Sequence, residues 1–293
     1  MECDGGRMIL LTGATGRVGS AAANRLLQAG VPFRVLARDP GKFTLADSSI
    51  QVVAGDLGDD VVVAEAVKDI DRALIVMGNH PDQARLERRF VDLAARAGVS
   101  HLVKISSMEA SPDATAELPK NHYDTEQHIV AQGLDWTFLR PNYYMQNMLM
   151  YAASISRAGQ FALPLAGAKT AMVDARDVGA VSAAVLMEEG HAGHIYRLTG
   201  PELIDFHEVA QRMSLALGSV VHYVEQSPAD FREVLGQFIH SAWQLDAVCE
   251  LFAEIANGSL EHLTTDVESL IGRPPLDLEA FTRAFSSAFA PHS

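Results

Sequence analysis

The chain has 293 residues, of which 48% are hydrophobic and 20% are charged, a balance typical of a folded protein with a substantial core. Its formal net charge of −14 disfavours binding to nucleic-acid phosphates or to anionic membrane surfaces. No apolar stretch reaches the ~18 residues of a membrane span, and the first residues lack the pattern of a secretory signal. The two cysteines, Cys3 and Cys249, follow no metal or redox spacing. We therefore expect a cytoplasmic protein without a nucleic-acid or membrane partner.

Short apolar runs rich in β-formers alternate with helical patterns through the first half of the chain. This alternation predicts parallel strands joined by right-handed crossovers, and hence an α/β fold with a Rossmann-type doubly wound parallel sheet. The predicted strands are 8–12, 33–37, 51–54, 73–77, 101–105 and 136–139, and the predicted helices are 18–27, 82–97 and 121–132.

The second half of the chain is less regular, and no linker rich in Pro, Gly or Ser separates it from the first. Its predicted strands are 195–198 and 220–224, and its predicted helices are 177–186, 228–235, 240–255 and 278–289. We expect a Rossmann domain over 7–155 and a smaller mixed α/β C-terminal lobe over 156–293. Part of 170–200 is expected to return to the Rossmann domain.

A glycine-rich segment, TGATGRVG over 12–19, follows the first strand and opens the first helix. In such a loop Gly13 permits a tight turn, Gly16 lets the backbone approach a pyrophosphate, and Gly19 lets the helix pack closely. The N–H groups at the helix start, together with the helix dipole, then hold the phosphates. A glycine triplet alone is a weak signal, but its position between a strand and a helix predicts dinucleotide binding.

The end of the second strand carries Arg38 and Asp39, with Lys42 shortly after. An acidic residue here accepts from a ribose 2′-hydroxyl and selects NAD, whereas a guanidinium binds the 2′-phosphate of NADP. Because Asp39 precedes Pro40-Gly41, its simpler role is that of a turn residue. We therefore predict NADP(H) as the cofactor, with an ordinary surface arginine as the alternative for Arg38.

Seven segments taken together resemble one family: TGATGRVG (12–19), RDP (38–40), GDL (55–57), KISS (104–107), NHYDTEQHI (121–129), LDWTFLRPNYYMQN (134–147) and LIGRPP (270–275). The chain resembles the NmrA-like branch of the atypical short-chain dehydrogenase/reductases, particularly its NADPH-dependent quinone reductase and triphenylmethane dye reductase members. The resemblance runs over nearly the whole chain. The combination of the H-x-x-T-E helix with LRPNYYMQN is its most specific mark.

The resemblance implies where the cofactor lies. Asp56 and Leu57 would form the adenine pocket, and Met77-Gly78-Asn79 would border the nicotinamide ribose. Ser106 and Ser107 would lie beneath the nicotinamide, with Pro141-Asn142-Tyr143 over its far side; a turn at the strand end is the simpler alternative for the two serines. With the loop and the ribose positions, the predicted cofactor residues are Thr12, Gly13, Thr15, Gly16, Arg17, Val18, Arg38, Lys42, Asp56, Leu57, Met77, Gly78, Asn79, Ser106, Ser107, Pro141, Asn142 and Tyr143.

The Tyr-x-x-x-Lys pair of ordinary short-chain dehydrogenases is missing, since the residue four positions after Tyr123 is Gln127. His122 is the best titratable candidate for a catalytic role. Its alternative is structural: with Asn121 as a helix cap, His122 and Glu126 would form an exposed i,i+4 pair. Tyr144 is the second catalytic candidate, and a core aromatic is its alternative.

These features favour an NADPH-dependent oxidoreductase that transfers hydride to a small electron-poor acceptor such as a quinone, an azo dye, an imine or a conjugated carbonyl. The alternative is a non-catalytic, NADP(H)-binding redox-sensing regulator of the NmrA type, since fold alone does not decide function. An isomerase that retains its cofactor is a third class, although it typically needs the missing tyrosine–lysine pair. A homodimer is possible. We expect no metal, because His191 and His194 lack a third ligand.

Overall fold

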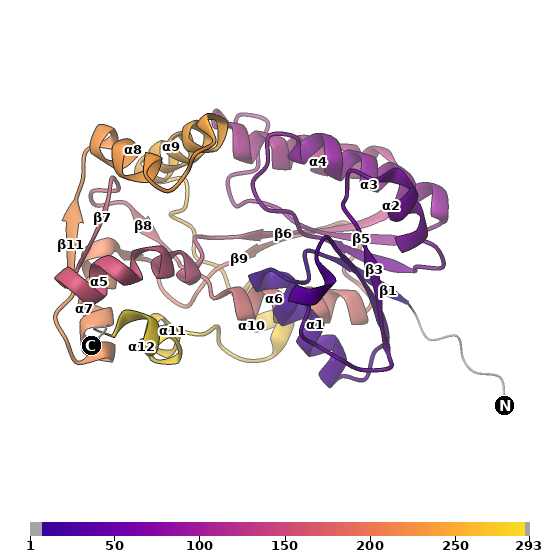
Figure 1. The fold of residues 1–293 in the computed structure, drawn as a ribbon, viewed down its shortest axis with the longest axis horizontal. Helices are drawn as coiled ribbons and strands as arrows, with labels where there is room; N and C mark the ends of the chain where they lie inside the picture. Colours follow the sequence, from indigo (N-terminus) through magenta and orange to yellow (C-terminus); the bar gives the residue numbers. More distant parts are fainter. Residues whose placement is uncertain (1–7, 291–293) are drawn as a thin grey trace. The chain divides into compact units, whose positions relative to one another are not determined.

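The computed structural model describes residues 8–290 (Figure 1), so Cys3 lies outside the described residues. The chain forms two compact units, which are described separately. Unit 1 comprises the residues up to Ala110 together with Asn121–Arg140 and Ala175–Tyr196. Unit 2 comprises Ser111–Lys120, Pro141–Asp174 and the residues from Arg197 onward. Among residues 8–290, no helix has the length and apolar character needed to cross a membrane.

The centre of unit 1 is a seven-stranded sheet in the order β3-β2-β1-β4-β5-β6-β9. The pairs from β3 to β6 are parallel. The order reverses between β1 and β4, which is the switch point of a doubly wound sheet. The predicted Rossmann-type fold is therefore confirmed. The strands are β1 (Ile9–Thr12), β2 (Phe33–Ala37), β3 (Ile50–Ala54), β4 (Arg72–Ile75), β5 (His101–Ile105), β6 (Asp135–Pro141) and β9 (His194–Leu198).

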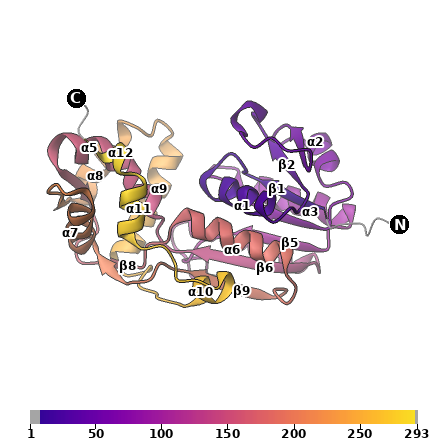
Figure 2. The same ribbon diagram turned by 90° about the horizontal axis from the view of Figure 1, so that it is seen from below.

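Helices cover both faces of this sheet (Figures 1 and 2). On one face lie α1 (Arg17–Gln28) and α6 (Ala175–Met187), and Gly179 lets them approach closely, since a Cβ there would lie 2.4 Å from the Ala21 Cβ. On the other face lie α2 (Asp60–Ala66), α3 (Gln83–Ala97) and α4 (Glu117–Ala131). Apolar side chains such as Phe90, Leu102 and Phe138 are buried between them and the strands.

Unit 2 mixes short strands and helices. Strand β7 (Gln160–Leu163) pairs in parallel with β11 (His222–Glu225), and β8 (Lys169–Thr170) pairs antiparallel to β10 (Ile204–Asp205). Its aromatic core includes Tyr143, Phe161, Phe206 and Tyr223. The helices are η2 (Met145–Tyr151), α5 (Ala152–Ala158), α7 (Phe206–Leu217), α8 (Pro228–Gly236), α9 (Ala242–Ala256), α10 (Asp266–Ile271), α11 (Leu278–Ala284) and α12 (Ser286–Phe289).

Three element predictions were wrong in their bounds. The helix predicted over 121–132 begins at Glu117, because Pro119 fits a first helical turn, where its missing N–H has no partner to lose. The strand predicted over 73–77 ends at Ile75, so residues 77–79 lie in the loop after it. The helix predicted over 278–289 is divided at Phe285, whose backbone (φ −110°, ψ 18°) is not helical.

Candidate functional site

The glycine loop joins β1 to α1 in a conformation that only its glycines allow. Gly13 has φ +61°, and a Cβ there would lie 2.7 Å from the Val76 carbonyl oxygen. A Cβ at Gly19 would lie 2.3 Å from the Gly13 oxygen, so the first turn of α1 packs directly on the loop. Gly16 is the N-cap of α1 and offers no side-chain cap, which leaves the first helical N–H groups for another acceptor. The loop therefore presents backbone donors at a helix N-terminus, a geometry that suits a phosphate.

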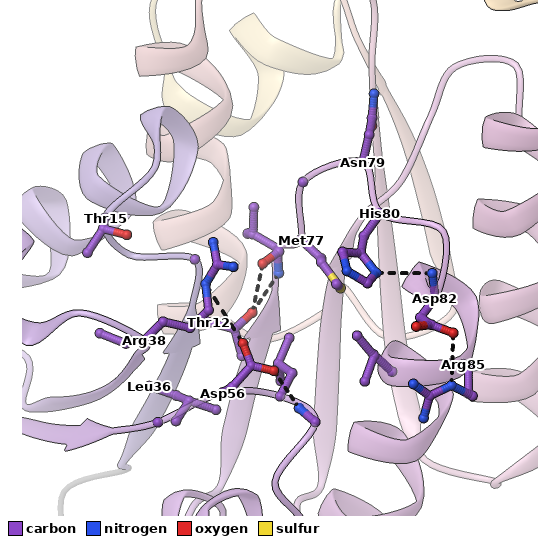
Figure 3. Close-up of a pocket in the computed structure, with 18 residues that line it drawn as sticks. Thr12, Thr15, Leu36, Arg38, Asp56, Met77, Asn79, His80, Asp82 and Arg85 are labelled. Atoms are coloured by element: carbon purple, nitrogen blue, oxygen red, sulfur yellow. Dashed lines mark hydrogen bonds and ion pairs between the residues drawn. The ribbon is translucent and has the colours of Figure 1, made fainter. Parts of the chain in front are cut away.

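A pocket of about 390 Å³ opens beside this loop at the carboxyl ends of β1, β2, β3 and β4 (Figure 3). Nine of the predicted cofactor residues line it: Thr12, Gly13, Thr15, Arg38, Asp56, Leu57, Met77, Gly78 and Asn79. Gly16, Arg17 and Val18 follow the same loop at the start of α1. The structure thus brings together the glycine loop and the segments that follow β2, β3 and β4.

The charged groups of the ribose end of this pocket form weak, exposed pairs. The Arg38 Nε lies 3.8 Å from the Asp56 Oδ2, and the two side chains are 83% and 54% exposed. Asp39 accepts a hydrogen bond from the Gly41 N–H at 3.1 Å and lies 3.7 Å from the Lys42 ammonium. Asp39 is therefore the turn residue that its position before Pro40-Gly41 indicated. Arg38 is left as the cation at the ribose end of the pocket.

The opposite wall contains residues that the sequence did not single out. The Asp82 N–H donates to the His80 Nδ1 at 3.0 Å, and the Arg85 Nε lies 3.1 Å from the Asp82 Oδ1. Figure 3 shows this pair across the pocket from Arg38 and Asp56. The available signal was their position just after β4, the strand that pairs with β1 across the switch point, although no motif marks them. They add a second arginine to the pocket lining.

The two serines after β5 differ in their surroundings. Ser106 is buried, its N–H donates to the Leu139 oxygen at 2.8 Å, and its Oγ is enclosed without a hydrogen-bond partner among the described residues. The Ser107 hydroxyl instead donates to the Glu109 carboxylate. An unpartnered buried hydroxyl costs stability unless a water or ligand satisfies it. Ser106 therefore suits contact with a bound molecule better than Ser107 does.

His122 and Glu126 on α4 do not form the exposed i,i+4 pair that the sequence offered as the structural alternative. Because α4 begins at Glu117, Asn121 lies inside the helix and is not its cap. Glu126 is buried and binds Arg140 with two hydrogen bonds, one of them 3.0 Å long, so it is not an exposed partner of His122. The His122 Nε2 lies 3.4 Å from the Gln83 Nε2, and its Nδ1 is enclosed without a partner among residues 8–290. Burial, with the charges of Lys104 and Arg140, holds the pKa of His122 well below its usual value.

A family model, the NmrA-like family, matches residues 6–282 of the chain. The chain belongs to the NmrA-like family. It is 32% identical to the NAD(P)H azoreductase of Xenophilus azovorans, over 96% of this chain and 99% of the relative. It is 36% identical to the (4-alkanoyl-5-oxo-2,5-dihydrofuran-3-yl)methyl phosphate reductase of Streptomyces griseus, over 97% and 100%. The crystal structure of an NADPH-dependent quinone oxidoreductase from Escherichia coli, complexed with NADPH, aligns with a TM-score of 0.86 at 27% identity, covering 95% and 99%.

In this NmrA-like protein the segment after β6 belongs to unit 2 and is tightly held there. The Asn142 Nδ2 donates to the Leu260 oxygen at 2.9 Å, and its Oδ1 accepts from the Tyr143 N–H at 2.7 Å. The Tyr143 ring packs edge-on against Phe206 and Phe252. Burial raises the pKa of Tyr143 and of Tyr144 well above the usual tyrosine value. Both hydroxyls therefore stay protonated at neutral pH.

Proposed function

We propose that this NmrA-like protein is an NADPH-dependent reductase that transfers hydride to a small, flat, electron-poor acceptor: a quinone, an azo compound, an imine or a conjugated carbonyl. The observation that carries the proposal is the pocket at the carboxyl edge of the doubly wound sheet, which runs from the glycine loop past Arg38. Dinucleotides bind at this position in such sheets. Two relatives at 32% and 36% identity are named as reductases, and a solved relative holds NADPH, which supports the same chemistry here.

The residues of the pocket fit this cofactor. The cradle at Gly13, Gly16 and the first turn of α1 suits the pyrophosphate, because the loop backbone carries no Cβ in the way. Arg38 suits the 2′-phosphate, since it lines the pocket while the Asp39 carboxylate accepts from the Gly41 N–H of its own turn. Asp56 and Leu57 would hold the adenine, and Met77-Gly78-Asn79 the nicotinamide ribose. The unpartnered Ser106 hydroxyl would contact the nicotinamide end.

The chemistry needs little acid from the protein for the first step. Bound NADPH supplies the hydride, and an electron-poor acceptor takes it without prior protonation. The protein's task is then to orient the two molecules and to exclude water. Pro141, Asn142, Tyr143 and Tyr144 are proposed as residues of the nicotinamide and acceptor side, with Ser107 and Lys42 as secondary cofactor contacts. His122 is proposed as the group that handles the proton.

Two measurements on the purified chain test the proposal. NADPH oxidation is followed with a panel of quinones, azo dyes, iminium dyes and conjugated carbonyls, and binding of NADPH and NADP⁺ is followed by fluorescence and calorimetry. We expect turnover with at least one acceptor class and preference for NADPH over NADH. Tight binding of both NADPH and NADP⁺ with unequal affinities and no turnover would favour the redox-sensing regulator instead. We also propose a cytoplasmic location, where NADPH is supplied, and a homodimer, which size-exclusion chromatography with light scattering would test.

A further inference from the structure

A cluster of four polar side chains lies in unit 1 between α3, α4 and β5; three of them are fully buried and His122 is half-buried. The Lys104 Nζ lies 2.6 Å from the Glu87 Oε2, and both side chains are 0% exposed. Gln83 lies one helical turn before Glu87 on the same face of α3. The His122 ring on α4 contacts this Gln83 side chain. Helices α3 and α4 lie side by side over this part of the sheet (Figure 1). We call Gln83, Glu87, Lys104 and His122 the buried polar cluster.

The buried polar cluster has more hydrogen-bonding groups than its members satisfy. The Gln83 Oε1, the Glu87 Oε1 and the His122 Nδ1 are all enclosed without a partner among the described residues. Gln83 and Glu87 are themselves fully buried, so bulk water does not reach these atoms. Unpartnered groups of this number in one place are rare in folded proteins unless ordered water bridges them. The Lys104 ammonium supplies the positive charge of the cluster, and it donates to Glu87 and, at a long 3.4 Å, to the Ile105 oxygen.

The cluster lies at the end of the sheet where the proposed reaction takes place. Lys104 is the second-last residue of β5. Ser106, whose hydroxyl is unpartnered, follows two positions later, just past the end of the strand. Gln83 begins α3, directly after the loop whose residues 77–80 line the cofactor pocket. Two of the elements that carry the cluster, β5 and α3, therefore adjoin segments of the nicotinamide end of the proposed site.

We infer that the buried polar cluster is a water-bridged proton relay, in which His122 protonates the acceptor after hydride transfer and Lys104, paired with Glu87, restores the proton to His122. The inference rests on the proposed reductase function. Two cations act on His122, Lys104 from β5 and Arg140 from β6. Each cation is itself paired with a buried carboxylate, Lys104 with Glu87 on α3 and Arg140 with Glu126 on α4. The nearby cations and the burial keep the imidazole neutral at pH 7, and a neutral imidazole passes a proton by taking it at one nitrogen and giving it at the other.

The step balances for an azo acceptor. The hydride from NADPH forms an N–H bond at one nitrogen of the N=N group, the π bond breaks, and its electron pair moves to the second nitrogen. Because the His122 Nε2 faces the Gln83 amide N–H, which can only donate, the neutral ring carries its proton on Nδ1. The second nitrogen of the azo group takes that proton from the Nδ1, while the Nε2 takes a proton that water relays from the Lys104 ammonium. NADPH is oxidised to NADP⁺ and the azo compound is reduced to the hydrazine. Lys104, which is itself shielded from bulk water, regains its proton through the bridging water after the product leaves.

Two acceptors that differ only in their need for a proton provide the test. A cationic triphenylmethane dye becomes a neutral product on taking a hydride, whereas a neutral azo dye needs a proton as well. We expect His122→Asn to lower azo turnover by about 100-fold or more and to change turnover of the cationic dye by less than about threefold. The matched control is His128→Asn, on the same helix, whose Nε2 lies 2.8 Å from the Asp92 Oδ1 on α3. Equal losses with both dyes, or no loss with the azo dye, would overturn the relay.

A measurement on the protein without cofactor tests the relay independently of turnover. In ¹⁵N-histidine NMR spectra we expect the His122 ring to stay neutral between about pH 6 and pH 8. We expect its N–H exchange with solvent to slow in the Glu87→Leu/Lys104→Met double variant, which removes both charges together. A charged ring at neutral pH, or unchanged exchange, would contradict the relay. A chain that binds no NADPH and reduces neither dye would end the proposed function, which separates that failure from failure of the relay alone.

Discussion

The cofactor pocket and the buried polar cluster of unit 1 both depend on ion pairs, but the pairs are of opposite kinds. In the pocket, Arg38 and Asp56 are 83% and 54% exposed and 3.8 Å apart, so water solvates both and the pair is weak. In the cluster, Lys104 and Glu87 are fully buried at 2.6 Å, so each needs the other. An exposed pair opens at little cost when a phosphate arrives. A buried pair keeps its geometry, which the proposed relay would need.

The two kinds of ion pair should differ most in how much the free energy of unfolding falls when one partner is removed. Lys104→Met leaves the Glu87 carboxylate buried without its cation and should lower the free energy of unfolding by about 3–5 kcal/mol. The matched exposed pair is Arg89 with Asp60, which joins α3 to α2 with both side chains more than 40% exposed. Arg89→Met should leave the denaturation midpoint nearly unchanged. Urea denaturation of both variants measures the difference.

The double variant Glu87→Leu/Lys104→Met removes both charges, and so it distinguishes the cost of an unpaired buried carboxylate from the loss of the ion pair. Since it replaces both charges with apolar groups of similar volume, it should recover most of the stability that Lys104→Met loses. If the single variant were as stable as the wild type, the contrast between buried and exposed pairs in unit 1 would be wrong.

The glycine loop was predictable from sequence because its geometry is local. Gly13, Gly16 and Gly19 lie within seven residues, and a Cβ at Gly16 or Gly19 would meet the backbone of Gly13 itself; only the contact of Gly13 with Val76 is distant in sequence. The buried polar cluster was not, because Lys104 and Glu87 are 17 residues apart and His122 and Gln83 are 39 apart. Only the stacking of α3 and α4 on β5 brings them together. The same reason explains the error at Glu126, whose buried partner Arg140 lies on the next strand.

Gly16→Val should produce the largest effect on the pocket alone. The wild-type φ of −88° suits any residue, and a Cβ there meets only the Gly13 oxygen, at 3.2 Å, so the fold should be retained. The added side chain would occupy the space needed for the pyrophosphate, which should weaken NADPH binding by about 100-fold or more. Fluorescence titration measures it, with Gly167→Val as control, since nothing lies within 4 Å of a Cβ at that position. Undiminished binding would remove the loop from the site.

Arg38→Ala should have a smaller and more selective effect. The guanidinium's charge-assisted bonds to a 2′-phosphate are worth ~1.5–3 kcal/mol, so NADPH affinity should fall roughly 10- to 150-fold while NADH affinity barely changes. Lys42, which lies 3.7 Å from Asp39, offers partial compensation and moves the loss toward the lower value. Dissociation constants of NADPH and NADH for the wild type, Arg38→Ala and Asp39→Ala show whether Arg38 or Asp39 sets the cofactor preference. A wild type that binds NADH at least as tightly as NADPH would contradict the assignment.

The smallest expected effect concerns the hydroxyl that other dehydrogenases need. Tyr123 lies on α4 next to His122, and the residue four positions after it is Gln127 and not a lysine. If the buried polar cluster handles the proton, Tyr123→Phe should keep nearly full turnover with both a cationic and an azo dye. Initial rates with saturating NADPH measure it. A loss of ~100-fold, about 2.7 kcal/mol of barrier, confined to the azo dye would transfer the proton-donor role from His122 to Tyr123. The two neighbouring side chains thus give opposite predictions for the same pair of substrates.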